Sequence, residues 1–195
     1  MIDIDTSIYV NEIERRGGET TIFSTPYGCG RSKGFNIPLQ CVNTTDGGLV
    51  LLRAEGWRFY SRNFGVRKAS IAYLCGSDDN GPWAVRVPGT CTSATAALDW
   101  HTPVEAKQAL AKGHKVVRQG DVWVIEKSTR GRDDAETGAG LPRTHSVTVD
   151  GQGRRRLVHT PAAGERKHRA IYLPRGPVGF AVGRRLETRR GGASD

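Results

Sequence analysis

The stretch IAYLCGSDDNGPWAVRV, residues 71–87, decides the fold class of this 195-residue chain. Two apolar runs, 71–75 and 83–87, flank a central segment rich in Gly, Asp and Asn. Apolar, β-rich runs on either side of turn-forming residues are typical of paired antiparallel strands. The stretch therefore predicts a β-hairpin with a longer loop.

Toward the N-terminus, short β-rich runs alternate with turns in the same way. Residues 20–24, 48–53 and 57–60 are rich in β-branched, apolar or aromatic side chains, and an Asp-Gly-Gly turn precedes the second run. We therefore expect antiparallel sheet through the first ninety or so residues. A mobile arm or short lead-in helix is expected at 1–20, where the sequence is polar.

Toward the C-terminus, residues 92–126 predict two helices and a second hairpin. Residues 92–100 form a short helical pattern, and Thr102-Pro103-Val104-Glu105 has the spacing of a capping box with proline at the first helical position. Gly113 is placed to end this second helix. The run KVVRQGDVWVIE (115–126) predicts two strands about a Gln-Gly-Asp turn. A helical pair packed on a sheet explains this pattern better than a winged helix does.

From the whole sequence we expect the chain to be organised in five parts. They are a mobile N-terminal arm (1–20), an α+β domain of sheet, helical pair and hairpin (21–126), a flexible loop (127–143), a basic β-rich segment packing on the domain (144–183) and a basic disordered tail (184–195). Strands within the fourth part are expected at 145–149, 156–159, 170–173 and 178–182. The expected fold is α+β, mostly antiparallel β with a central short helical pair and a basic β-rich C-terminal region.

The net charge of +9 lies entirely in the second half of the chain. Residues 1–100 contain ten Lys/Arg and ten Asp/Glu, whereas residues 101–195 contain nineteen and ten. Such one-sided basic composition favours an anionic partner, and nucleic acid first among them. Phosphate contacts are expected from Arg143, Arg154, Arg155, Arg156, Lys167, Arg169, Arg184 and Arg185. The alternative is that these charges are simply solvated.

Three of the five histidines lie at the ends of expected strands. His145 and His159 belong to adjacent strands joined by a short turn, which places them across from one another, and His168 begins the next strand. Three converging imidazoles bind a metal ion or act as general acid and base on a phosphodiester, and the alternative is a structural or phosphate-contacting role. Neighbouring arginines repel a divalent cation, so no metal or cofactor is expected, with Zn²⁺ or Mg²⁺ as the alternative.

Other motifs are weaker. The four cysteines, at 29, 41, 75 and 91, form no C-x-x-C pair and are expected to be thiols, with a zinc site as the alternative. The Gly-rich stretch 27–34 lacks the order of a phosphate-binding loop, and 57–62 reads better as a half-buried strand than as a stacking platform. Without a long apolar run or a signal-peptide pattern, the chain is expected to have no membrane partner and to be cytoplasmic, in the host cytoplasm if phage-encoded.

Three strings, WAVRVPGT (83–90), AALDWHTPVEAK (96–107) and VRQGDV (117–122), carry a family resemblance. The chain resembles small uncharacterised proteins of actinobacteria, their phages and plasmids, and haloarchaea, in which a helical segment precedes an R-Q-G-[DE] hairpin and a β region with spaced histidines follows. The likeness covers roughly residues 70–180, although the compact H-P-E-H cluster of that pattern is here opened by eight residues between His159 and His168. The resemblance implies a phage or mobile-element setting and supplies no activity.

These observations predict a nucleic-acid-binding protein of a phage or mobile element that contacts phosphates through its basic C-terminal surface. The first alternative is a His-dependent phosphodiesterase or nuclease that uses His145, His159 and His168 with or without a metal. The second alternative is a virion or host-interaction protein, whose charge serves solubility or an acidic partner.

Overall fold

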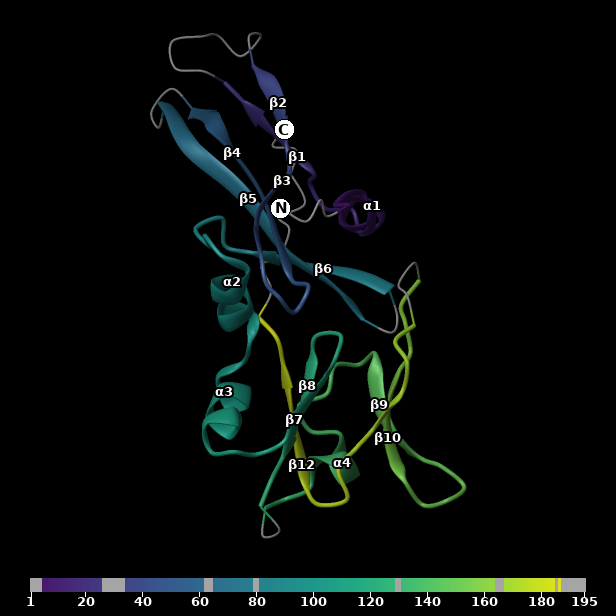
Figure 1. Cartoon of the computed structure of the whole chain (residues 1–195). Helices are drawn as coiled ribbons and strands as arrows, with labels where there is room; N and C mark the ends of the chain where they lie inside the picture. The colour runs from purple at the N-terminus through teal and green to yellow at the C-terminus, as the bar shows by residue number, and fades with distance from the viewer. Residues whose placement is uncertain are drawn as a thin grey trace. The chain divides into compact units, whose positions relative to one another are not determined.

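The computed structural model describes residues 5–25, 34–61, 65–78, 81–128, 131–163, 167–184 and 186. Its four sheets are antiparallel and its helices are short, so the predicted α+β class is confirmed. The chain divides into two compact units, unit 1 (1–99 and 185–195) and unit 2 (100–184), which differs from the expected five parts (Figure 1). Within the described ranges, every helix is too short or too polar to cross a bilayer.

Unit 1 is built on a four-stranded sheet with the order β3-β4-β5-β6. Its strands are β3 (Gln40–Thr44), β4 (Val50–Ser61), β5 (Gly65–Asp78) and β6 (Gly81–Val87). The hairpin expected at 71–87 is β5–β6, but its strands extend into the expected loop and pair as far as Asp78 and Gly81. Gly76 permits this extension, because a Cβ there would come within 2.5 Å of the indole of Trp83, its partner across the ladder.

A two-stranded ribbon packs on this sheet. It consists of β1 (Thr21–Ser24) and β2 (Phe35–Pro38), which pair antiparallel. Ile22 of the ribbon is buried in one cluster with Ala54 and Ile71 of the sheet. Strands β2 and β3 were not predicted, because each is only four or five residues long and Asn or Pro interrupts its β-rich pattern.

Helix α1 (Ser7–Arg15) lies where a mobile arm or a short lead-in helix was expected. Tyr9 and Ile13, four residues apart, lie on one face of the helix and are buried against β4 and β5 in a cluster that includes Leu52 and Tyr73. An arm that buries a tyrosine and an isoleucine is part of the core. Of the two expectations for this segment, the structure shows the short helix.

The same helix buries a carboxylate. Glu12 is only 2% exposed and accepts hydrogen bonds from the guanidinium groups of Arg15, at 2.8 Å, and Arg16, at 2.7 Å. Burial raises the pKa of Glu12, but the hydrogen bonds and positive charges of the two arginines outweigh it, so the pKa lies below its ordinary value. The ion pairs with Arg15 and Arg16 allow the charged side chain of Glu12 to be buried.

The chain passes from unit 1 to unit 2 within helix α2 (Ala94–His101), and α3 (Val104–Ala111) follows. Pro103 occupies the N-cap position of α3, so the predicted capping box with Thr102 as N-cap and proline at the first helical position is wrong. The extended ψ of 151° at Pro103 starts the helix one residue later than expected. Gly113 follows the helix at φ +74°, as predicted, and the N–H of His114 donates to the carbonyl of Ala109 at 3.0 Å.

Unit 2 is layered around a three-stranded sheet with the order β12-β8-β7. The strands are β7 (Val116–Gln119), β8 (Val122–Glu126) and β12 (Val178–Val182). On one face, Trp123 and Ile125 pack on α3, and on the other, Val124 and Phe180 pack on Leu157. Figure 1 shows α3 and the β9–β10 hairpin on opposite sides of β8. The last strand therefore completes a central sheet with β8 and β7.

The second sheet of unit 2 has the order β11-β10-β9 and supplies Leu157 to this core. Its strands are β9 (His145–Val149), β10 (Arg155–His159) and β11 (Ile171–Tyr172). The expected flexible loop at 127–143 contains a short helix, α4 (Asp134–Thr137), and packs Ala135 and Leu141 on the same core. These two apolar side chains were too few for the sequence to predict that this segment packs on the core. Of the expected tail, only Arg184 and Leu186 belong to the described residues.

Candidate nucleic-acid interface

Strand β10 presents alternate side chains to the two faces of its sheet. Leu157 and His159 are buried on the face toward the core of unit 2, which we call the inner face. The strand registers place the alternate residues of β10, and their partners across the ladder, on the opposite face, which we call the outer face. The outer face is Ser146, Thr148, Arg154, Arg156, Val158 and Tyr172. The sheet therefore separates two of the predicted phosphate-binding arginines from the histidines.

The three histidines meet at one end of the inner face, and we call them the histidine cluster. His145 and His159 pair directly across β9 and β10, as the sequence predicted, with ring centroids 4.7 Å apart. The His168 ring lies 4.5 Å from that of His159 and 6.4 Å from that of His145. The backbone N–H of His168 also donates to Nδ1 of His159 at 3.2 Å. The chain thus brings together all three residues that the sequence singled out.

The turn between β7 and β8, which holds the R-Q-G-D string, packs against the histidine cluster. Gln119 is buried, and its Nε2 donates to the carbonyl oxygens of Leu157, at 3.4 Å, and Arg169. Gly120 has φ +58°, and a Cβ at this position would lie 2.7 Å from Nε2 of His168. The string therefore joins the two sheets of unit 2 where the histidines gather.

The histidine cluster has the character of a packed core element. His145 and His159 are only 8% and 4% exposed. The three rings pack against one another with interplanar angles of 23° to 43°. Among the residues that the structure describes, no group of three or more His, Cys, Asp or Glu is arranged to hold a metal ion. A phosphodiester on the outer face would lie across the sheet from the cluster.

The contact between the turn and the cluster predicts the effect of Gly120→Ala. Both Gly120 and Gly113 have positive φ, but a Cβ at Gly113 meets nothing within 4 Å, so Gly113→Ala reports backbone strain alone. We expect Gly120→Ala to destabilise unit 2 by about 1 kcal/mol more than Gly113→Ala in urea unfolding, because the methyl group displaces the ring of His168. Equal losses of stability in the two variants would contradict the contact.

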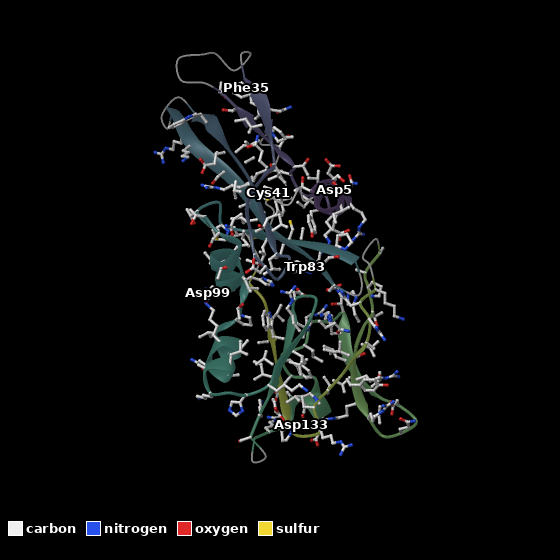
Figure 2. The ribbon with its side chains drawn as sticks, in the orientation of Figure 1. Asp5, Phe35, Cys41, Trp83, Asp99 and Asp133 are labelled. Atoms are coloured by element: carbon white, nitrogen blue, oxygen red, sulfur yellow. The ribbon has the colours of Figure 1, made fainter. Side chains whose placement is uncertain are left out.

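Arg155 is held inside unit 2 by Asp133, which Figure 2 labels. The guanidinium pairs with this carboxylate and donates to the carbonyl oxygens of Pro174, at 2.7 Å, and Gly176. Asp133 also accepts the N–H groups of Ala135 and Val178, each at 3.1 Å. Burial raises the pKa of Asp133, but these two N–H groups and the arginine lower it more, so the balance lies below the ordinary value. Arg155, predicted to contact phosphate, is placed here as a link between β10, α4 and β12.

The outer face combines arginine with an exposed aromatic ring. Tyr172 is 51% exposed and lies directly across the ladder from Arg156. Cζ of Arg154 lies 4.4 Å from the centroid of the Tyr172 ring, and its Nη2 donates to the tyrosine hydroxyl at 2.8 Å. Asp150 anchors Arg154 from the other side through Nε, at 3.0 Å. The result is a fixed cation–π pair on the solvent side of the sheet.

The other predicted phosphate-binding residues differ in position. Four of them have exposed side chains, namely Arg143, Lys167, Arg169 and Arg184. Arg185 lies outside the described residues, as do residues 27–33 of the Gly-rich stretch and the side chains of 58–62. The cysteines that the structure describes, Cys41, Cys75 and Cys91, are free thiols, and burial raises the pKa of the latter two.

Sequence reasoning missed Tyr172 as a member of the interface. The signal was the alternation that puts Arg154 and Arg156 on one face, but the partner strand follows a connection of eleven residues between His159 and Ile171. Its register could not be read from the sequence. Comparison of the chain with family models, with curated proteins and with solved structures finds no match.

Proposed function

We propose that unit 2 binds nucleic acid, using the outer face of the β11-β10-β9 sheet and the exposed basic residues beside it to contact phosphates. The resemblance carried by the R-Q-G-D hairpin adds a phage or mobile-element setting to the proposal. No part of the proposal depends on the histidine cluster.

Arg156 carries the proposal. Its side chain is half-buried between Thr148 and Tyr172, its Nε is buried without a hydrogen-bond partner, and no carboxylate among the described residues pairs with it. Its neighbours Arg154 and Arg155 are paired with carboxylates. A guanidinium held on a sheet face without a counter-charge matches the geometry and charge of a phosphate.

The surrounding charge supports the same partner. Residues 143–184 contain nine Lys/Arg and two Asp/Glu, and one of the two acids, Asp150, already binds Arg154. By contrast, residues 1–99 of unit 1 contain ten of each. A polyanion is therefore attracted mainly to unit 2, and the attraction depends on salt because it releases counterions.

Binding of a labelled mixed-sequence 20-nucleotide DNA, single-stranded and duplex, to the full chain tests the proposal. With about five phosphates neutralised on a single strand, the slope of log K against log salt is expected near −3.5, a loss of affinity of roughly 100-fold between 50 and 200 mM salt. Absence of binding to both DNAs at 50 mM salt would overturn the proposal.

A further inference from the structure

We propose that Tyr172, set by Arg154 and Arg156, is a base-stacking site that makes unit 2 prefer single-stranded nucleic acid. This inference rests on the proposed function and adds the class of nucleic acid to it. It starts from the exposure of Tyr172, half of whose surface is open to solvent although it lies in a hydrogen-bonded strand. Such a ring on a sheet is available for a ligand with a flat π face.

The ring of Tyr172 is held in place before any ligand arrives. Arg154 lies over one face of the ring and binds its hydroxyl, and Asp150 in turn fixes Arg154 through Nε and through the Arg154 backbone N–H, at 2.9 Å. A ring already fixed by its neighbours loses little side-chain entropy when a base stacks on it. The pair thus presents an ordered surface on an otherwise short, two-residue strand.

Arg156 supplies the second half of the site. It is the direct cross-strand neighbour of Tyr172, so its Cβ lies about 5 Å from that of the tyrosine on the same face. A base on the ring places the adjoining sugar and phosphate within reach of this guanidinium, which has no carboxylate partner among the described residues. Aromatic stacking joined to arginine–phosphate contact is how sequence-tolerant single-strand binders hold successive nucleotides.

A duplex cannot use this site in the same way. Its bases are paired and stacked on one another, so their flat faces are closed to a protein side chain and only their edges are exposed. Duplex DNA would still meet the positive charges around the outer face. The site therefore adds affinity for a single strand above a shared electrostatic background.

The test compares a 10-nucleotide DNA strand that has bases with an abasic strand of the same length, which keeps the phosphates and removes the stacking partner. Tyr172→Ala is expected to weaken binding of the strand with bases by about 10-fold and to leave the abasic strand within twofold. Tyr172→Phe keeps the ring and is expected to stay close to wild type. Phe35→Ala removes a comparably exposed ring, 55% exposed, from unit 1 and serves as the matched control.

The outcomes separate the two proposals. If wild type binds the strand with bases but Tyr172→Ala weakens neither strand, or weakens both equally, the stacking site is overturned and the proposed function stands. If wild type binds no strand and no duplex at 50 mM salt, the proposed function fails and the stacking site with it. Loss of affinity in Phe35→Ala but not in Tyr172→Ala would move the site to unit 1 and overturn the inference. Circular dichroism of each variant shows that it is folded.

Discussion

Asp133→Ala is expected to lower the free energy of unfolding of unit 2 by about 3 kcal/mol, a fall in melting temperature on the order of 15 °C for a unit of this size. The substitution removes the counter-charge of the partly buried Arg155 and leaves the N–H groups of Ala135 and Val178 without their acceptor. Thermal unfolding of the full chain measures the change. Glu105→Ala, which removes an exposed carboxylate from α3, is the control and is expected to change little.

The Asp133–Arg155 pair also predicts how the difference in unfolding free energy between wild type and Asp133→Ala depends on pH. The pKa of Asp133 is lowered in the folded chain from its ordinary value of 3.8, so its stabilising effect is complete above that value and is lost as the pH falls through the lower, folded pKa. Wild type and Asp133→Ala should therefore differ most near neutral pH and converge below about pH 3.8. A difference that persists unchanged at acidic pH would show that the carboxylate charge is not its source.

Arg156→Glu is expected to weaken binding of single-stranded DNA by at least about 10-fold at 100 mM salt and to make the salt slope shallower by about one. The substitution removes the outer-face guanidinium that has no carboxylate partner within the described residues and puts a negative charge beside Tyr172. Arg156→Gln, which keeps the size and polarity of the side chain more closely, is expected to show the smaller loss of a single phosphate contact. Fluorescence anisotropy measures both affinities.

The control for this variant is Lys112→Glu, which changes the net charge of unit 2 by the same amount. Lys112 is exposed at the end of α3, on the other side of the central sheet from β10. We expect its effect to stay within about twofold, because at physiological salt a charge more than about 10 Å away is largely screened. Equal losses in the two charge-reversal variants would mean that binding follows net charge and has no preferred face.

Local pattern was enough to predict much of the fold and part of the candidate site. The short turn after Val149 predicted that His145 and His159 pair across β9 and β10, and they do. The R-Q-G-D turn and the Gly113 helix end were also visible, because turn chemistry depends on neighbouring residues only. The counts of charged residues alone were enough to predict that the C-terminal half of the chain is the basic half.

Contacts between distant segments could not be predicted. Pairing of β12 with β8 joins residues more than fifty positions apart, and no local pattern encodes that register. The burial of α1 depends on its contact with residues of β4 and β5 that are distant in the sequence, so the mostly polar segment 1–20 gave no local sign of it. The separation of Arg154 and Arg156 from Arg155 required both the alternation of β10 and the position of Asp133, which lies in a segment that was predicted to be a loop.

The most direct test of the account is an amide NMR titration of the full chain with a 12-nucleotide single-stranded DNA. The largest shifts are expected on β10, β11 and the neighbouring exposed basic positions of unit 2, with α3 and residues 5–99 little changed. Shifts confined to residues 5–99 or to α3, or no shifts at a DNA concentration that saturates binding, would contradict it.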